Sequence, residues 1–274
     1  MKEMIRMNGN NGNLRKIILT GLMTALVYLF TSIIKIPTVN GYIHLGDGFI
    51  FLSTLILGPF YGAFASGVGS MLSDVLSQYA QWAIPTLIIK SSMALVMGLV
   101  LRHRNRKEIV ISAATTVTVW VAFFVVIKNA LARAVVYSVD SLASALEDTP
   151  ENVINAASDT QWKLTAAIAA VIIIMFAIIL YMVRKKNIEG IGVGVILGML
   201  SSGAVMVIGY YIADFILYGN PISPVFSVPM NLIQLLIGIV ITVAIAPALL
   251  KAKAFYFGDK DRSDSTTEPQ SPER

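Results

Sequence analysis

The sequence predicts an all-α integral membrane protein, and three observations support this fold class. First, 56% of the 274 residues are hydrophobic and 14% are charged, whereas a soluble domain carries about 25% charged residues. Second, several apolar runs contain no Asp, Glu, Lys or Arg, and each is near or above the roughly 20 residues that cross a bilayer as a helix. These runs are 17–34, 109–127, 164–183, 190–213 and 215–250. Third, Lys and Arg cluster just outside the runs, as they do in cytosolic loops.

The basic clusters set the expected topology of the later spans. If the clusters at 102–107, 184–186 and 251–253 are all cytosolic, an even number of spans must separate them. Two spans, about 109–137 and 162–184, fit the first interval, and the acidic connection between them suits an external loop. The second interval holds two further spans, which are broken by the double-proline turn Asn220-Pro-Ile-Ser-Pro224.

The first third of the chain needs four spans to keep the same orientation. It contains three apolar stretches, and an odd number would place the cluster at 102–107 outside. We therefore predict that 48–73 makes two passes that turn at Gly58-Pro59. The first pass, about 46–58, rises only ~20 Å against a ~30 Å bilayer core, so it must be tilted, sunken or shielded. The prediction is eight spans with both termini cytosolic.

Several function classes are disfavoured by what the sequence lacks. There is no cysteine and no G-x-x-x-x-G-K-[ST] motif, and there are two histidines without H-E-x-x-H. Disulfides, a P-loop for ATP and a zinc hydrolase site are therefore not expected. The net charge of +5 resides in the clusters beside the spans, so it predicts orientation and not a nucleic-acid partner. We expect a protein that is not an enzyme and that has no catalytic residues, no cofactor and no metal.

Polar residues within the predicted spans gather toward their outer halves. At a rise of ~1.5 Å per residue, Lys90 and Asp74 lie at about the same depth, roughly 10 Å below the outer surface. Asn231 and Gln234 share one face of the last span, and Asp214 lies near the outer end of the seventh. Ionisable groups inside a membrane are costly and indicate function. The pattern predicts a binding pocket that is open to the outside.

A glycine-rich polar loop at the mouth of this pocket is the most informative segment. An irregular polar loop between apolar segments is costly in a membrane unless it lines water or a ligand. We therefore predict that Tyr42, His44 and Asp47 of this loop contact the ligand. At the outer boundary, Trp82 is a candidate stacking surface, and Gln78 continues the polar stripe that contains Asp74.

Structural roles compete with these assignments. Asp74 and Lys90 can simply neutralise each other, because a buried ion pair is weak evidence for function. Trp82 also fits an anchor at the membrane interface, and His44 fits an ordinary loop residue. If Lys90 binds the ligand, Lys90→Ala should abolish binding and leave the fold intact.

A series of short motifs runs through the first third of the chain. They are Leu19-Thr-Gly-Leu-Met-Thr-Ala25, Ile36-Pro37, Gly41-Tyr-Ile-His-Leu-Gly-Asp47, Leu57-Gly-Pro-Phe-Tyr-Gly62, Gly69-Ser70, Asp74 and Pro85-Thr-Leu-Ile-Ile-Lys90. In order and spacing, these motifs resemble the substrate-binding S components of energy-coupling factor (ECF) transporters, in the riboflavin-type branch. The resemblance covers residues 14–102 and resumes more weakly at 190–250.

The resemblance implies a six-helix bundle in the cell membrane that captures a vitamin or related micronutrient from outside. The implied partners, besides membrane lipid, are a transmembrane coupling (T) subunit and two cytosolic ATPase subunits that drive uptake. Residues 36–47 would form a lid over the pocket. Gly21 and Ala25 take the place of a small-xxx-small motif that contacts the coupling subunit.

The eight predicted spans exceed the usual six of that family by two. We therefore expect an inserted transmembrane hairpin between the two halves of an S-component-like core. The expected parts are a first half with four spans at 1–107, the hairpin with its acidic external loop at 108–186, a second half with two spans at 187–257, and a disordered cytosolic tail at 258–274.

Two other functions compete with the S-component hypothesis. One is a stand-alone secondary transporter, with Asp74 or Asp214 as its proton site. The other is a lipid-modifying enzyme, which would need acid and base residues at the cytosolic interface, where the sequence shows none. The nutrient stays open among riboflavin, a pyridoxine-like vitamin, a thiamine precursor and pantothenate. An anionic nutrient would suit Lys90 unless Asp74 already pairs with it.

Overall fold

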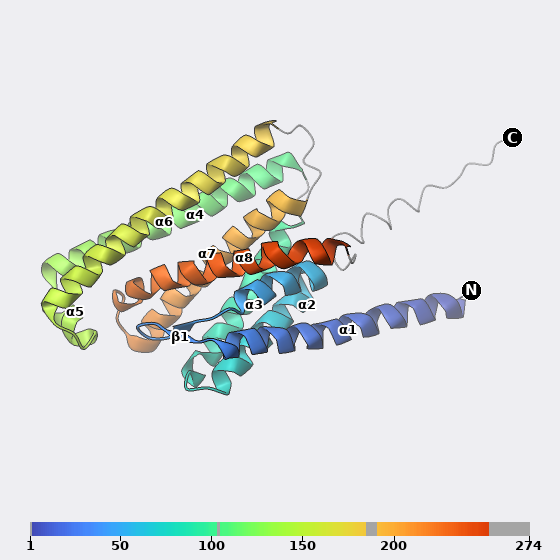
Figure 1. The fold of residues 1–274 in the computed structure, drawn as a ribbon, viewed down its shortest axis with the longest axis horizontal. Coiled ribbons are helices and arrows are strands. Elements are labelled where there is room, and N and C mark those ends of the chain that lie inside the picture. Colours follow the sequence, from blue (N-terminus) through green and yellow to red (C-terminus); the bar gives the residue numbers. More distant parts are fainter. Residues whose placement is uncertain (1, 103–104, 185–190, 252–274) are drawn as a thin grey trace.

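The computed structural model describes residues 2–102, 105–184 and 191–251, and it shows an elongated bundle of long helices (Figure 1). The predicted all-α membrane fold is confirmed, since six of the described helical segments are long and apolar enough to cross a membrane. The elements are α1 (Lys2–Ile33), β1 (Ile36–Pro37), β2 (Tyr42–Ile43), α2 (Asp47–Val75), the 3-10 helix η1 (Ala80–Trp82), α3 (Ala83–Val100), α4 (Arg106–Tyr137), α5 (Val139–Ala145), α6 (Pro150–Arg184), α7 (Ile191–Tyr218), the 3-10 helix η2 (Ser223–Ser227) and α8 (Val228–Lys251).

Helix α2 doubles back on itself, as the sequence predicted. Gly58 at the turn has φ 78° and ψ −177°, a conformation that is essentially restricted to glycine. Ser53 and Ser66 lie 13 positions apart, yet their hydroxyl oxygens are 3.0 Å apart, whereas a straight helix would separate them by about 20 Å. At Gly62, an added Cβ would lie only 2.9 Å from the Cα of Thr54. Small residues therefore let the two passes pack backbone to backbone.

The short first pass of α2 is shielded by its neighbours. Residues 47–55 are buried except for the half-buried Phe49. Helix α8 approaches this pass closely, because a Cβ added to Gly238 would lie 2.9 Å from the Cβ of Asp47. With the two passes of α2 counted separately, α1, α2, α3, α4, α6, α7 and α8 make eight helical passes of the bundle, and the six candidate membrane spans among the described residues are these helices without α6, with α2 counted once. The number of spans and the side of the membrane that each end faces stay predictions.

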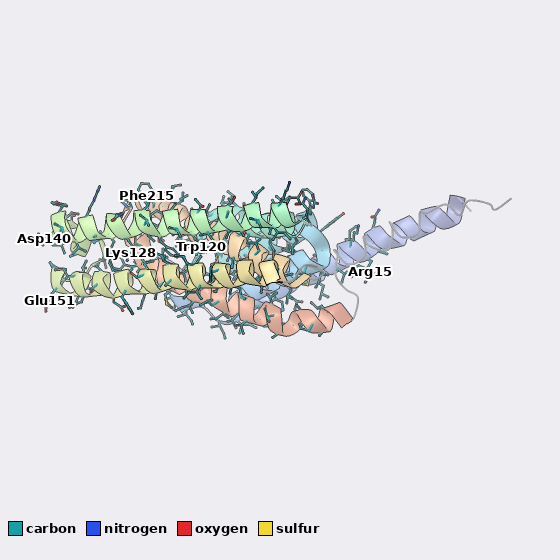
Figure 2. All side chains as sticks on the ribbon, turned by 90° about the horizontal axis from the view of Figure 1, so that it is seen from above. Arg15, Trp120, Lys128, Asp140, Glu151 and Phe215 are labelled. Carbon is teal, nitrogen blue, oxygen red and sulfur yellow. The ribbon has the colours of Figure 1, made fainter. Side chains whose placement is uncertain are left out.

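Helices α4 and α6 pack side by side along one flank of the bundle (Figures 1 and 2). Helix α4 is fastened to α7 by two polar contacts. The indole nitrogen of Trp120 donates to the carbonyl of Leu200 at 3.1 Å, and the hydroxyls of Thr116 and Ser201 lie 2.7 Å apart. The described parts of α4 and α6 are therefore packed against the rest of the bundle through α4.

The two ends of the bundle differ in charge. Figure 2 shows Asp140 and Glu151 at one end and Arg15 toward the other. The β1–β2 hairpin lies at the same end as α5 (Figure 1), with Ile36 paired to Ile43 in antiparallel register. The acidic connection and the polar loop thus share the end where the sequence placed the external mouth of the pocket.

Candidate functional site

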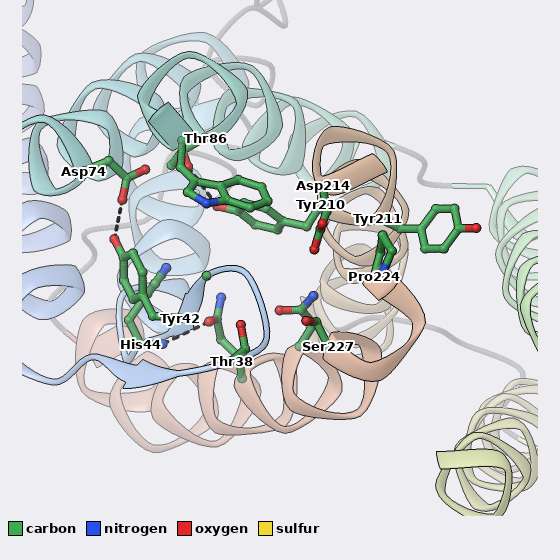
Figure 3. Close-up of a pocket in the computed structure, with 14 residues that line it drawn as sticks. Thr38, Tyr42, His44, Asp74, Thr86, Tyr210, Tyr211, Asp214, Pro224 and Ser227 are labelled. Carbon is green, nitrogen blue, oxygen red and sulfur yellow. Dashed lines mark hydrogen bonds between the residues drawn. The ribbon is translucent and has the colours of Figure 1, made fainter. Parts of the chain in front are cut away.

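A pocket lies under the β1–β2 hairpin, where α2, α3, α7 and α8 meet (Figure 3). The free volume of the pocket in this closed form is about 40 Å³. Binding sites for small organic ligands usually measure about 300–1,000 Å³, so the closed pocket is too small to hold such a ligand. The lining residues are Thr38, Gly41, Tyr42, His44, Asp74, Trp82, Thr86, Tyr210, Tyr211, Asp214, Pro224, Ser227, Asn231 and Gln234.

Asn40, at the tip of the hairpin, fastens the loop over this pocket. Its side-chain amide donates to Asp214 at 2.8 Å and to the hydroxyl of Ser223 at 3.1 Å. Its main-chain carbonyl accepts from the indole of Trp82 at 2.9 Å and from the hydroxyl of Tyr218 at 3.3 Å. One loop residue is therefore held by α7, η1 and η2 together, and the loop is closed.

Tyr42 fixes the second strand of the hairpin to the opposite wall. Its hydroxyl donates to one carboxylate oxygen of Asp74, and its ring packs 4.5 Å from the ring of Tyr79. The ammonium group of Lys35 lies 4.5 Å from the centre of the Tyr42 ring and donates to the carbonyl of Ser73 at 3.0 Å. Burial, and then the nearby Asp74, raise the pKa of Tyr42, so its hydroxyl stays protonated and remains a donor.

His44 is a neutral acceptor in the closed loop. It is 6% exposed, and its Nδ1 accepts from the backbone amide of Gly46 at 3.0 Å. Burial, with a further contribution from Lys90, lowers the pKa of His44 to about 3. The backbone amide of His44 donates to the side chain of Gln234 at 3.0 Å. His44 is therefore a buried anchor of the loop as well as a lining residue.

Lys90 pairs with Asp47 and not with Asp74, which corrects the pairing considered from the sequence. The ammonium and carboxylate of this ion pair are 2.5 Å apart and both side chains are fully buried. The amide of Gln234 donates to the second oxygen of Asp47 at 2.9 Å. Depth along the helices could not reveal this choice, because Asp47 lies at the start of α2 in what the sequence suggested was a free loop. The network ties α2, α3 and α8 together behind the pocket.

Three of the predicted ligand contacts are not lining residues. Asp47 and Lys90 are occupied by each other behind the wall. Gln78 is exposed, because α2 ends at Val75 and the helical stripe that contains Asp74 does not continue to it. The other seven predicted contacts do line the pocket, and they are Tyr42, His44, Asp74, Trp82, Asp214, Asn231 and Gln234.

Trp82 forms a wall of the pocket. It is 5% exposed, and its ring centre lies 5.8 Å from that of Tyr210 and 6.2 Å from that of Tyr218. Burial against two tyrosines and the loop does not fit an anchor in the lipid interface. Gly21 and Ala25, by contrast, are exposed on α1, and a Cβ added to Gly21 would meet no atom within 4 Å.

Sequence reasoning missed several residues at this site. Asn40 precedes Gly41, and Asn-Gly between extended segments is a hairpin signal that could have drawn attention to it. Thr86 lies one helical turn before Lys90 and lines the pocket. Tyr211 lines the edge of the pocket, but its ring points outward toward α4 (Figure 3), where it meets Phe123 edge to face at 5.6 Å between ring centres.

Comparison with known proteins identifies the family. A family model described as "ECF-type riboflavin transporter, S component" matches residues 11–181, more than half of the chain. The chain belongs to this family. The resemblance in the first third of the sequence is therefore confirmed at the level of the family, whose description is that of a transporter S component.

A second comparison adds little about activity. An "Uncharacterized protein in gap 3'region" of Pyrococcus woesei is 45% identical over 65 residues, which cover 24% of this chain and 43% of that relative. No solved structure matches the chain. The family match includes α4 and most of α6, so it does not mark these helices as additions, and the division of the S component into core and inserted hairpin stays a prediction.

Proposed function

We propose that this S component captures a small aromatic or heterocyclic nutrient, a vitamin or a related micronutrient, from outside the cell. The observation that carries the proposal is the closed hairpin over a pocket walled by Trp82, Tyr42 and Tyr210. Flat aromatic side chains provide the apolar, stacking walls that ring compounds need. Riboflavin is the first candidate, because it appears in the description of the family.

Capture requires the loop to move. The pocket is too narrow for a vitamin-sized molecule while Asn40 holds the hairpin closed. The ligand enters an open form, and its contacts then favour closure through the difference in affinity between the two forms.

Transport would be driven by partner subunits in the cell membrane. The proposed partners are a transmembrane coupling subunit and two cytosolic ATPases. The exposed small residues Gly21 and Ala25 provide a face on α1 that another helix can approach closely. Gly21→Leu should leave ligand binding intact and abolish co-purification with the coupling subunit, whereas loss of ligand binding in this variant would argue against a separate docking face.

The direct test of the capture role is purification of the intact chain from cells, followed by mass spectrometry of the small molecules that co-purify. A ring-containing nutrient at near one equivalent is the expected result. A chain that is well folded, carries no small molecule and takes up none from a panel of the four candidate vitamins would contradict the proposal.

Stand-alone proton-coupled transport is the second candidate, because the pocket contains two buried carboxylates, Asp74 and Asp214. Measurements of uptake in proteoliposomes distinguish the proton-coupled mechanism from the S-component mechanism. The proton-coupled mechanism works with this chain alone and collapses with an uncoupler, whereas the S-component mechanism requires the partner subunits and ATP.

A further inference from the structure

Two buried polar atoms on the pocket walls have no hydrogen-bond partner among the described residues. They are the second carboxylate oxygen (Oδ2) of Asp74 and the hydroxyl oxygen of Ser227. Asp74 is 1% exposed and Ser227 is 7% exposed, and both line the pocket. An unpaired polar group in such a site costs free energy, and this cost is relieved if a ligand supplies the missing partner.

The two atoms belong to opposite sides of the pocket. Asp74 lies on the second pass of α2 and Ser227 on η2, and Figure 3 shows them on either side of the space beneath the hairpin. Tyr42 already occupies the first oxygen of Asp74. Thr86, its neighbour on α3, accepts from the hydroxyl of Tyr210 at 3.3 Å, and no described residue makes a hydrogen bond to the second oxygen of Asp74. The free oxygen of a carboxylate accepts hydrogen bonds, so the group that completes it must be a donor.

The charges around the pocket point the same way. Its described lining contains two carboxylates, Asp74 and Asp214, and no lysine or arginine. The nearest buried ammonium, that of Lys90, is held by Asp47 at 2.5 Å behind the wall. Lys35 lies outside the lining, where its ammonium group contacts a backbone carbonyl and the Tyr42 ring. Both of these partners are neutral, so the charge of Lys35 can offset only one of the two carboxylates. An anion in this pocket would therefore still meet an excess of negative charge.

We propose that the ligand of this site is an uncharged or cationic ring compound that donates a hydrogen bond to Oδ2 of Asp74, and that the pocket discriminates against anionic forms such as phosphate esters. This inference rests on the proposed capture function and specifies the chemistry of its ligand. It also reverses the expectation that Lys90 would suit an anionic nutrient.

Riboflavin and riboflavin 5′-phosphate are matched probes, because they share one ring system and differ by a phosphate. Both dissociation constants are measured by titrating the intact chain in detergent with each probe, with the quenching of flavin fluorescence as the readout. We expect riboflavin to bind at least about tenfold more tightly, because the carboxylates of the lining repel the phosphate group of the ester. In Asp74→Asn, riboflavin should bind about tenfold more weakly. The phosphate ester should lose less affinity, or gain some, so the ratio of the two dissociation constants becomes smaller.

Structural damage or the size of the phosphate cannot produce this change of ratio. Structural damage weakens the binding of both probes together, and a penalty from the size of the phosphate does not depend on the charge at Asp74. Asp140→Asn, on the exposed acidic connection, is the matched control and should change neither constant. Ser227→Ala removes the second unpaired atom without changing charge, so it should weaken riboflavin and keep the ratio. This variant tests the site independently if Asp74→Asn does not fold.

The outcomes separate the inference from the function on which it rests. Equal affinity of the wild-type chain for both probes, or an unchanged ratio in folded Asp74→Asn, overturns the inference and leaves the capture of a flavin standing. Absence of binding of both probes to the wild-type chain overturns the proposed function in its riboflavin form, and the inference with it.

Discussion

Replacing Asn40 with alanine should loosen the closed hairpin without touching the helices. The substitution removes the amide that donates to Asp214 and to Ser223. The main-chain bonds from Trp82 and Tyr218 to residue 40 can still form, because they use its backbone carbonyl. The variant therefore isolates the contribution of the side chain to closure.

The size of the effect follows from the two lost bonds. A hydrogen bond to a charged group contributes about 1.5–3 kcal/mol and one between neutral groups about 0.5–1.5 kcal/mol. Asn40 is partly exposed, so we take the lower end of both ranges, which gives about 2 kcal/mol. Since 1.4 kcal/mol corresponds to tenfold, the open form should become about 30-fold more populated relative to the closed form.

Hydrogen exchange of the loop amides measures this population directly. The amide of His44 donates to the side chain of Gln234 on α8 at 3.0 Å, so it is protected only in the closed form and should exchange about 30-fold faster in Asn40→Ala. The amide of Thr38 donates to Gly41 within the hairpin itself, so an intact hairpin that opens keeps this bond, and its exchange should change less. Asn152→Ala is the matched control, because it removes an exposed amide-to-carboxylate bond of 2.7 Å to Asp148 and should leave the loop unchanged. Less than a twofold increase at the His44 amide, or an equal increase in the control, would refute the role of the Asn40 side chain in closure.

Three further predictions concern stability and pH. Lys90→Met should lower the free energy of unfolding by about 3–5 kcal/mol, because it leaves Asp47 charged and buried without a partner; Asp47→Leu in the same chain should restore most of the thermal midpoint, and a single variant as stable as wild type would contradict the buried pair. Gly58→Ala should cost about 1–3 kcal/mol, because alanine is strained at φ 78°; an unchanged midpoint would mean that the turn does not need this conformation. The closed loop should become less stable as pH falls below 6.5, because His44 takes up a proton more readily when the loop is open than in the closed form, where its pKa is about 3. At pH 5 the free energy of closure should fall by about 2 kcal/mol. Exchange at the loop amides that is identical at pH 7 and pH 5, after correction for intrinsic rates, would rule out this pH effect.

The buried pair changes the effect expected of Lys90→Ala, for an energetic reason. From the sequence, Lys90→Ala was expected to lose the ligand and keep the fold. The ammonium instead neutralises Asp47 at a distance of 2.5 Å, with both side chains fully buried. Removing one member of such a pair is costly to the whole bundle, so loss of binding in this variant would not identify a ligand contact.

Helices α4 to α6 support the wall to which the loop is fastened. Leu142 and Val153 form a buried cluster with Ala134 and Ala143, and Ile222 and Phe226 of the α7–α8 connection pack against it. Ser223, which accepts from Asn40, lies in the same connection. The segment read as an inserted hairpin thus braces the part of the site that receives the tip of the lid.

The passes of the bundle and its polar end could be predicted because each depends on local properties of the chain. A run of about 20 apolar residues must form a helix in a membrane, since its backbone groups have no other partners there. The parity of the basic clusters then required a turn at Gly58, and the contact between Ser53 and Ser66 confirms it. For the same reason, the similar depth of Asp74, Asp214, Asn231 and Gln234 followed from helical rise alone, and all four line one pocket.

Only the tertiary structure decided which polar groups contact one another. Several side chains lie at similar depth, and rotation of the helices about their axes, which the sequence does not specify, determines their partners. As a result of this rotation, Lys90 pairs with Asp47, and one oxygen of Asp74 has no partner among the described residues. The sequence by itself therefore determined a membrane bundle with one polar end, whereas the charge of the pocket depended on long-range packing between helices.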